Sequence, residues 1–478
     1  MTARNEPAPD LRSFLAANPE LVFRPDAPLS VVEEITAILH ALEAEKRQPV
    51  VLVDRPVRVD GTESDTPVLC NLTASREVCA SALGLADHRD SARHFAGLAA
   101  GEIAPVEVGR ADAPVQAIVA EGAQADLRTL PALKQHGGDA GHYITAGHVV
   151  TADPETGIDN MAIQRCWVRE ARLMGVYPYS TSHNWLNVAK YWDRGEPCPV
   201  AVWIGHHPAL VIGSQAKFAY PRSHWEAAGA ALGAPVRLVP SITHGEAVMV
   251  PADAEIVIEG FIPPHRLEAE GPFAEFTGYQ GPQVANPVVE VTAITRRADA
   301  IYQDCGAGLA DHLVPDNMAM EGAIFAMCRN AAPALRRVHV PISGRRFHAY
   351  LQFENPRPGE VRDALTAALS YRRLKAVMAF DHDIDIFDDS QAMWALATRL
   401  QWDRDTIRID RLSEANLDPS TPPGAGSTTK VALDATLPPP RRPGAPRPVP
   451  RGNSVNPDAL ETARAAIAGA DDSGWPRA

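Results

Sequence analysis

The sequence lacks the features of secreted, membrane-spanning and nucleic-acid-binding proteins. No run reaches the roughly 18 uncharged apolar residues that cross a bilayer, and the first 22 residues contain no apolar core of a secretory signal. The formal net charge of -14 disfavours nucleic acid or an anionic membrane as the main partner, because both attract basic surfaces. We therefore expect a cytoplasmic protein without nucleic-acid or membrane partners.

Cysteine patterns and common catalytic motifs are also missing. The six cysteines are scattered and none stands in a CxxC pair, so reduced thiols are expected rather than disulfides or a zinc site. The absence of GxSxG, P-loop and HExxH motifs weakens the serine hydrolase, kinase and zinc protease interpretations.

Three segments resemble known binding motifs, but each lacks a feature that the motif requires. CGAGLAD (305–311) has an aspartate where a dinucleotide fingerprint needs its third glycine. DHDIDIFDD (381–389) lacks the glycine and the closing glutamate of a calcium loop. Adjacent histidines at 206 and 207 in a strand would point to opposite faces, so they cannot readily hold one metal.

The 478 residues are enough for two or three domains. Ser30 and Glu33 predict a capping box that opens a helix, and PVVLVD (49–54) predicts a buried strand. Short β-rich runs then dominate from about 115 to 300, which favours an antiparallel sheet or barrel. These runs are YITAGHVVT (143–151), AVWIGHHPALVIG (201–213), EIVIEGFI (255–262) and PVVEVTAIT (287–295).

The pattern changes after about residue 315. Helical spacing over 316–338, 361–374 and 390–400, with a strand within 374–387, predicts an α/β domain. Residues 418–454 are rich in Pro, Gly, Ser and Arg and predict an extended arm. Asn456-Pro457 is typical of the start of a closing helix over 457–469. Such an arm often reaches a neighbouring subunit.

Two separated segments carry candidate catalytic groups. Glu270 and Glu275 flank Gly271-Pro272, which precludes a regular helix. Neighbouring carboxylates repel unless a cation lies between them or one takes a proton. Arg165 is a candidate cation, because its planar fork can bind carboxylates on two sides. A buried carboxylate with a raised pKa suits general acid catalysis, although two exposed loop glutamates would show the same pattern.

The other segment offers a candidate metal site. Asn160 and His183, with a carboxylate, form a plausible ligand set for magnesium or manganese, completed by phosphate or water. Composition alone is weak support for a metal site, because most asparagines in such loops are turn residues and most histidines near aromatic side chains are simply packed.

Several motifs in order resemble UbiD-family decarboxylases. They are NMAIQR (160–165), His183, VPADAEIVIEG (250–260), EGPFAEFTGY (270–279), DHDID (381–385) and WALATR (394–399). The resemblance covers roughly residues 110 to 435. It implies a non-oxidative, reversible decarboxylation of an aromatic or heteroaromatic acid through a covalent adduct with prenylated FMN, and a carboxy-lyase that releases CO2.

The resemblance also implies the fold and the domain boundaries. The expected class is α+β, with a split β-barrel (flavin-reductase-like) core and an α/β C-terminal domain used for oligomerisation. The expected divisions are an N-terminal α/β segment of the cofactor domain (1–110), the prenylated-FMN-binding barrel (111–315), the C-terminal domain (316–417) and an arm with a terminal helix (418–478). A homodimer or homohexamer is expected, supplied with cofactor by a flavin prenyltransferase.

Site roles follow from the same resemblance. Glu275 is the expected proton donor, Arg165 orients the substrate carboxylate, and Glu270 holds Arg165. Metal ligands are Asn160, His183 and either Glu226, which the spacing favours, or His224, which the following Ala-Gly pair favours. The metal is Mn²⁺ or Mg²⁺, and K⁺ is a further candidate ion. The cofactor-lining residues are Asn160, Ile163, Gln164, Arg165, Ser182, His183 and Lys375.

Substrate contacts and rival functions stay open at this point. His312 and Asn317 are candidate substrate-binding residues, which would favour a pyrrole-, furan- or indole-type acid or a hydroxybenzoate. Alternatively, Asn317 or Asp316 caps the following helix. One rival function is an FMN-dependent oxidoreductase, and another is a non-catalytic subunit of a decarboxylase complex.

Overall fold

The structure is a computed structural model that describes residues 9–98, 101–178, 182–415, 417–422, 424–437 and 455–468. Its contacts divide the chain into Met1–Ala435 and Thr436–Ala478. The described part of the second unit contains α11 (Pro457–Ala468), and the Asp458 amide donates to Asn456 Oδ1 over 3.0 Å. The predicted closing helix is therefore present. Residues 423 and 438–454 of the predicted arm, and residue 469, lie outside the described residues.

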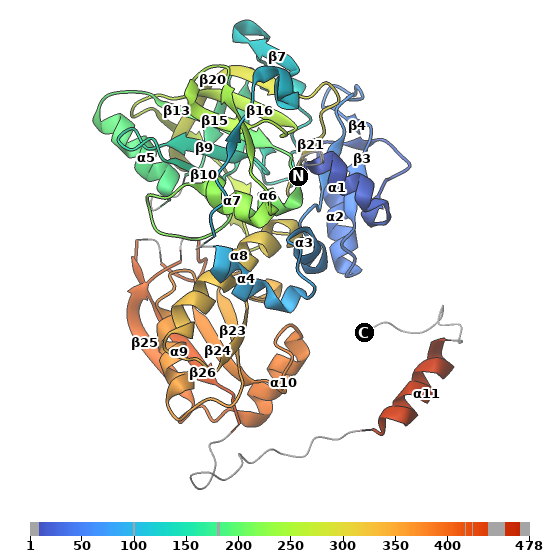
Figure 1. Cartoon of the computed structure of the whole chain (residues 1–478), viewed down its shortest axis with the longest axis vertical. Helices are drawn as coiled ribbons and strands as arrows, with labels where there is room; N and C mark the ends of the chain where they lie inside the picture. Colours follow the sequence, from blue (N-terminus) through green and yellow to red (C-terminus); the bar gives the residue numbers. More distant parts are fainter. Residues whose placement is uncertain are drawn as a thin grey trace, which may run out of the picture. The chain divides into compact units, whose positions relative to one another are not determined.

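A small α/β layer forms the N-terminal part of the first unit (Figure 1). Its strand order is β1-β3-β5-β21. The predicted buried strand is present as β3, whose four residues are all buried. The elements are α1 (Leu11–Ala17), β1 (Val22–Phe23), α2 (Glu34–Ala44), β3 (Val50–Val53), β5 (Val68–Cys70), α3 (Arg76–Ala82), α4 (Ser91–Leu98) and β21 (Tyr302–Gln303). A separate short pair joins β2 (Leu29–Ser30) to β4 (Pro56–Val57).

The capping box predicted at Ser30 is not present. Ser30 lies in β2, and α2 begins at Glu34, whose carboxylate accepts from the Ser30 amide over 2.7 Å. The parallel β2–β4 pairing holds this backbone extended, so the helix starts one turn later. The helix packs on the core through Ile35, Leu39 and Leu42, which are buried.

Ten strands form the central sheet, which curls into a half barrel. Their main order is β10-β9-β13-β16-β20-β12-β11-β8, and β7 and β17 also pair with β20. This confirms the predicted α+β class and antiparallel sheet. The bounds are β7 (Ile118–Glu121), β8 (His142–Ile144), β9 (His148–Ala152), β10 (Asp159–Ile163), β11 (Cys166–Glu170), β12 (Leu173–Val176), β13 (Cys198–Ile204), β16 (Ile256–Ile262), β17 (Leu267–Glu270) and β20 (Val284–Arg296).

The long β20 organises this sheet. It pairs with four other strands, and its register against β16 shifts between Glu259 and Gly260. A Cβ atom at Gly260 would lie 2.2 Å from the Glu290 carbonyl oxygen, so only glycine fits this bulge. Because β20 begins beside β17, the bulged strand also fixes where Glu270 stands.

Part of one predicted β run is a helix. Residues 201–204 belong to β13, but 208–213 form α6 (Pro208–Gly213). His207 Nδ1 accepts from the Ala209 amide, and Pro208 occupies the first helical turn. These two residues are start signals for a helix, and they outweigh the apolar run. The paired histidines are therefore part of a helix start rather than of a strand.

Five further strands and two further helices belong to this region. A sheet of order β15-β14-β6 and the hairpin β18–β19 complete the β structure of this region. The elements are β6 (Val106–Glu107), α5 (His183–Asp193), α7 (His224–Leu232), β14 (Arg237–Ser241), β15 (Gly245–Pro251), β18 (Phe273–Ala274) and β19 (Gln280–Gly281).

The C-terminal domain is an α/β layer, and α4 and α8 lie between it and the half barrel (Figure 1). Its five-stranded sheet has the order β22-β23-β24-β26-β25. The predicted arm is wrong for 427–434, because this segment is β26 and pairs with two strands. The elements are α8 (Ala310–Arg329), β22 (Leu335–His339), β23 (His348–Phe353), α9 (Glu360–Leu369), β24 (Ala376–Asp381), α10 (Asp389–Arg399), β25 (Thr406–Ser413) and β26 (Ser427–Asp434).

Helix α8 begins earlier than predicted. It starts at Ala310, and Pro315 lies inside it, so neither Asp316 nor Asn317 is a helix cap. Most of its residues are buried, which hides the amphipathic pattern that locates a helix start. The final residues of the predicted segment, from 335, belong to β22 instead.

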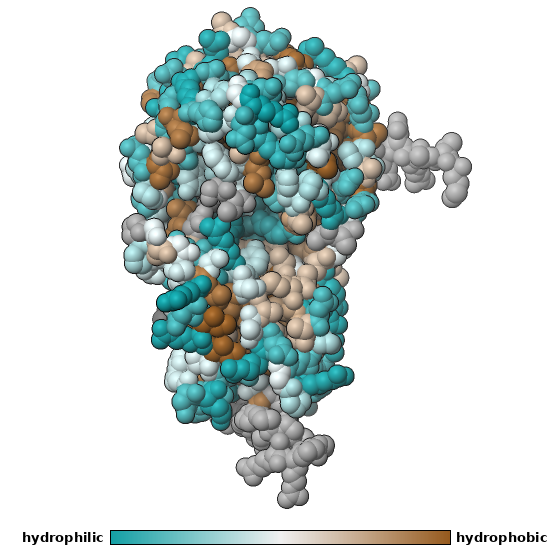
Figure 2. All heavy atoms as spheres, turned by 90° about the vertical axis from the view of Figure 1, so that its left-hand side faces the viewer, coloured by the Kyte–Doolittle hydropathy of each residue, from teal (hydrophilic) through white to brown (hydrophobic). Residues whose placement is uncertain are grey.

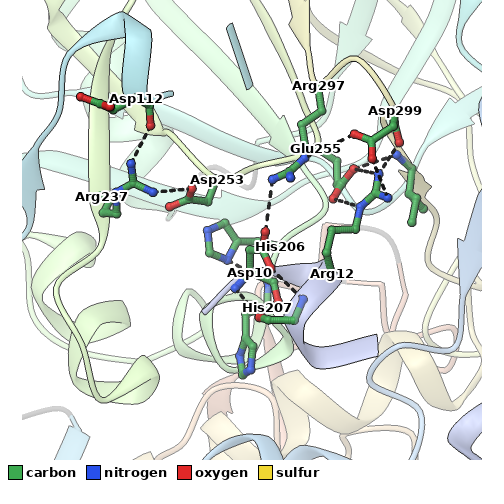
Figure 3. Close-up of polar contacts among 12 residues, drawn as sticks. Asp10, Arg12, Asp112, His206, His207, Arg237, Asp253, Glu255, Arg297 and Asp299 are labelled. Atoms are coloured by element: carbon green, nitrogen blue, oxygen red, sulfur yellow. Dashed lines mark hydrogen bonds and ion pairs between the residues drawn. The ribbon is translucent and has the colours of Figure 1, made fainter. Parts of the chain in front are cut away.

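A buried ionic network attaches α1 to the half barrel (Figure 3). Glu255 is fully buried and accepts from Arg12 Nε and Nη2 over 2.9 and 3.0 Å. Its Oε2 also accepts from the Ile301 amide over 2.8 Å, and Asp10 pairs with Arg297 over 3.2 Å. This network fixes the N-terminal segment against β16.

None of the described helices has both the length and the apolarity needed to cross a membrane.

Candidate active site

A cavity of about 450 Å³ lies where the half barrel meets the C-terminal domain. Its wall combines the end of β10, the segment before α7, the first turns of α8 and residues 371–373. The surface is hollowed at the level of this junction (Figure 2). Concave sites between domains are common locations for cofactors and substrates.

One guanidinium joins the two predicted glutamates in the wall of this cavity. Arg165 Nε and Nη2 donate to Glu270 over 3.0 and 2.6 Å, and Nη1 donates to Glu275 Oε1. The exposed side-chain fractions are 9% for Arg165, 1% for Glu270 and 8% for Glu275. The structure therefore brings Arg165 to two glutamates that lie 105 and 110 positions further along the sequence.

The local strands explain this meeting. Arg165 lies between β10 and β11, whereas Glu270 ends β17 and Glu275 follows β18. Asn286 Nδ2, on β20, donates to Glu270 Oε2 over 3.2 Å and fixes the carboxylate plane. As predicted, the segment around Gly271-Pro272 is not helical, and its short strands aim both carboxylates at the same side.

Glu275 and Arg165 have different electrostatic surroundings. Burial raises the pKa of Glu275, and the nearby Glu270 charge adds to the rise, while Arg165 opposes it. Burial alone would lower the pKa of Arg165, but the hydrogen bond to Glu270 and both carboxylate charges raise it above its ordinary value. The guanidinium therefore stays charged, while Glu275 can hold a proton at higher pH than an exposed glutamate.

Arg165 retains capacity for a third anion. It makes three hydrogen bonds with the described residues, whereas a guanidinium has five N–H groups. Its face lies on the Tyr177 ring, with Cζ 4.3 Å from the ring centroid. A substrate carboxylate is the kind of ligand that such a fork binds with two hydrogen bonds.

Asn160, His183 and His224 meet at another part of the wall. The Asn160 amide lies 3.2 Å from His224 Nδ1, and the two imidazole centroids are 6.2 Å apart. Burial lowers the pKa of His224 to about 3, so its ring is neutral, as a metal ligand must be. Glu226 does not line the cavity, and its backbone carbonyl accepts from the Ile103 amide. Of the two candidate third ligands, His224 therefore lies beside Asn160 in the cavity wall, whereas Glu226, which the sequence spacing favours, does not line the cavity.

A cationic group lies beside these residues. Asp316 contacts Lys217 Nζ over 2.7 Å and Arg346 Nη1 over 3.3 Å, and it also pairs with Arg373. Burial alone would raise the pKa of Asp316, but the three cations hold it well below its usual range. Three cations around one carboxylate leave a net positive charge, which favours an anionic ligand such as phosphate.

The cavity also contains an unsatisfied acceptor suited to a flavin. Gln164 Oε1 is buried and has no hydrogen-bond partner among the described residues. An acceptor of this kind is costly unless a ligand N–H or O–H satisfies it. Ile163 and Ser182 line the same cavity. The residues present therefore fit a flavin phosphate near the cations, a metal between Asn160 and the histidines, and a ring near Gln164.

A metal there would need ligands beyond side chains. Within the part of the chain that the structure describes, no group of three or more His, Cys, Asp or Glu residues is arranged to hold a metal. Asn160 and the two imidazoles provide three donors, and phosphate or water would complete the coordination.

The remaining predicted residues differ in their placement. His312 lines the cavity, and its Nδ1 accepts from the Gly308 amide over 3.1 Å. Asn317 does not line it; its Nδ2 donates to the Val340 carbonyl, and its Oδ1 accepts from Arg346 over 3.3 Å. Lys375 is not brought to the cavity, because it binds Asp418 over 2.9 Å and Ser420 over 2.6 Å.

The sequence did not point to several polar residues of the cavity wall, among them Tyr177, Lys217, Arg346 and Arg373. Lys217 and the two arginines stand in loops or turns with no spacing that marks a site. A basic cluster such as RR at 345–346 and YRR at 371–373 was the available signal. From sequence alone such a cluster is typical of a charged surface, and only the fold shows that Arg346, Arg372 and Arg373 line the cavity.

Comparison with known proteins gives a consistent assignment. Residues 15–97, 106–309 and 317–435 match the N-terminal, Rift-related and C-terminal domains of 3-octaprenyl-4-hydroxybenzoate carboxy-lyase (UbiD). An anhydromevalonate phosphate decarboxylase from Methanothermobacter thermautotrophicus is 29% identical over 418 residues, which cover 86% of this chain and 94% of that protein.

Solved structures agree over almost the whole chain. The UbiD-class enzyme HmfF from Pelotomaculum thermopropionicum, in complex with FMN, is 32% identical with a TM-score of 0.86, covering 96% of this chain and 99% of that one. A 3,4-dihydroxybenzoic acid decarboxylase from Enterobacter cloacae is 26% identical with a TM-score of 0.82, covering 96% and 100%. The protein described here belongs to the UbiD family and is a carboxy-lyase.

Proposed function

We propose that this enzyme decarboxylates an unsaturated, aromatic or heteroaromatic acid with prenylated FMN, and that Glu275 is the proton donor. The observation that carries the proposal is Arg165 held between Glu270 and Glu275 in the cavity wall. FMN and prenylated FMN appear in two structures of HmfF, a relative that covers nearly the whole chain. When bound, prenylated FMN would take up the electrons of the broken carbon–carbon bond.

The protein's own residues would perform three tasks. Arg165 binds the substrate carboxylate with its remaining N–H groups, and Glu270 fixes the guanidinium plane. After CO2 leaves, Glu275 gives its proton to the carbon that carried the carboxylate. Burial supports this role, because it raises the pKa of Glu275 and so favours the protonated form that a general acid needs.

His312 narrows the substrate class. Its Nδ1 accepts a backbone hydrogen bond, and burial lowers its pKa to about 3, so the ring is neutral with its proton on Nε2. That Nε2–H would donate to the substrate. We therefore favour an acid that presents an acceptor, such as a hydroxyl, a furan oxygen or a second anionic group, over a pyrrole or indole N–H. Asn317 would act indirectly by holding Arg346.

The substrate need not be aromatic. A relative that matches 86% of this chain is named for a phosphorylated, non-aromatic acid. The panel of test substrates should therefore contain a hydroxybenzoate, furan-, pyrrole- and indole-carboxylates and anhydromevalonate phosphate. A rate that is highest for the pyrrole and indole acids would contradict the donor role of His312.

The central experiment compares enzyme purified from cells with and without a co-expressed flavin prenyltransferase. We expect a changed ultraviolet–visible spectrum and CO2 release only from the first preparation. Glu275→Gln should keep the cofactor spectrum and lose decarboxylation by about a hundredfold or more. Glu268→Gln, on the same segment but paired with Arg169 and Arg266, is the control. Wild-type activity in the Glu275 variant would refute the proposed donor.

The metal site has a separate test. We propose Mn²⁺ rather than Mg²⁺, because two imidazoles favour a transition metal over a cation that prefers oxygen ligands. His224→Ala should reduce the manganese content measured by elemental analysis, whereas Glu226→Ala should not. The reverse result would restore the ligand that the sequence spacing favoured. A K⁺ requirement and a homodimeric or homohexameric state remain predictions, which ion-dependent activity and light scattering can test.

A further inference from the structure

A second cavity, of about 440 Å³, shares a wall with the active-site cavity. Three residues line both cavities: Ala274, Glu275 and Ala307. The other residues around the second cavity come from α2, from the loop before β8, from residues 278–280, from the two residues before α8 and from Arg345. Glu275 therefore stands between the two cavities, and the decarboxylation described above uses only one of them.

The two oxygens of Glu275 differ in their contacts. Oε1 accepts from Arg165 Nη1, whereas Oε2 has no hydrogen bond to any residue that the structure describes. A proton donor must regain a proton after each turnover, and the substrate side of Glu275 would then be covered by product and cofactor. The second cavity is the other route by which water can reach this carboxylate.

Two histidines line the second cavity and contact each other. His136 Nε2 lies 3.2 Å from His40 Nε2, so one ring donates to the other. His40 is exposed, whereas the His136 side chain is 25% exposed. The pair therefore connects bulk solvent with a partly enclosed space, and it is a typical arrangement for proton exchange near neutral pH.

Asp139 couples this pair to the segment that carries the donor. His136 Nδ1 lies 3.6 Å from Asp139 Oδ2, which also accepts from the His136 amide over 2.8 Å. Asp139 Oδ1 accepts from the Ala274 amide over 3.0 Å, one residue before Glu275. A single buried carboxylate thus fixes His136 relative to Glu275.

Other polar groups face the same cavity. Glu43 on α2, Arg345 and Tyr279 line it. Burial lowers the pKa of His40, a charge on His136 would lower it further, and Glu43 opposes both effects. His40 is therefore mostly neutral at pH 7, and a neutral imidazole can both accept a proton from water and pass it on.

We propose that the second cavity is the path by which solvent protons return to Glu275, with His136 and His40 as positioning residues that hold and pass the proton. The inference rests on the proposed role of Glu275 as donor. For each turnover the substrate carbon–carboxylate bond breaks and CO2 leaves. The proton of Glu275 forms the new C–H bond, and one solvent proton passes through the histidine pair and water to the Glu275 carboxylate.

The test separates the first turnover from the later ones. Holoenzyme of the His136→Gln variant is mixed rapidly with a substrate identified in the panel, and the decarboxylated product is followed with time. The first turnover uses the proton already on Glu275, so we expect one equivalent of product per site at the wild-type rate. The following steady state should be slower by about tenfold or more, and added imidazole should restore it.

Two further variants complete the design. His40→Gln alters an exposed residue and should show a weaker form of the same pattern. His142→Gln is the matched control, because this histidine binds the Ala132 carbonyl and does not line either cavity. It should leave both phases unchanged.

Each other outcome counts against the inference. Unchanged steady-state rates in both His136→Gln and the His40/His136 double variant would refute it. Equal loss of both phases would show that the histidines only support the position of Glu275, and a change confined to KM would make the cavity a substrate entrance. A failure of the proposed function is distinguishable, because then wild type would release no CO2 or Glu275→Gln would be fully active.

Discussion

Replacing Glu270 by glutamine should displace the pH dependence of decarboxylation. Both carboxylates bind one guanidinium, and the Glu270 charge contributes to the raised pKa of Glu275. Two unit charges on neighbouring edges of a guanidinium, roughly 6 Å apart, interact by about 3 kcal/mol at an effective dielectric of about 20. This energy corresponds to about two pKa units, and Arg165 between the charges reduces the expected change to about one or two units.

The direction of the shift follows from the proposed role of Glu275 as an acid. The donor is active when protonated, so the rate is maintained below its pKa and falls as pH rises through it. Removing the Glu270 charge lowers the pKa of Glu275. The descending limb of kcat/KM against pH should therefore move to lower pH by about one or two units.

The assay is CO2 release from holoenzyme between pH 5 and 9, with the profile normalised to its own maximum. Normalisation separates the displacement from any loss of stability caused by the lost charge on a residue that is 1% exposed. Glu268→Gln removes one charge two residues away on β17 and should not move the limb. A limb that stays in place, or moves to higher pH, would refute the electrostatic coupling of the two glutamates.

Three further outcomes follow from the structure. Gly281→Ala places a Cβ atom 3.0 Å from Glu275 Oε1, so kcat should fall while the cofactor spectrum is kept; unchanged kcat would contradict this contact. Glu255→Gln weakens a buried charged pair with Arg12 and should lower the free energy of unfolding in urea by about 3 kcal/mol; a loss below about 1 kcal/mol would mean that the pair contributes little. Burial raises the pKa of Asp304 to about 8, so the folded state keeps a proton that the unfolded state releases above about pH 4. Stability should therefore fall between about pH 4 and 8, and Asp304→Asn should flatten this dependence in thermal unfolding; an unchanged slope would show that Asp304 is already ionised.

The sequence by itself determined much of the fold class and identified three of the residues that meet in the candidate site. The runs at 50–53 and 256–262 became buried strands, because they are apolar and rich in Val and Ile, whose β-branched side chains favour strands. Gly271-Pro272 excluded a helix between Glu270 and Glu275, and the order of the motifs pointed to the family. Apolar runs, turn residues and the order of motifs are properties of the chain itself, so they can be recognised in a single sequence without the fold.

Only the tertiary structure decided which residues meet. The 110 positions between Arg165 and Glu275, and the 96 between His40 and His136, are closed by strand pairing and helix packing that no local pattern encodes. The same packing placed His224 rather than Glu226 beside Asn160, directed Lys375 to Asp418, and turned Lys217 and Arg373 towards Asp316. Charge and side-chain chemistry are set residue by residue, but the distances that turn them into a site depend on the whole fold.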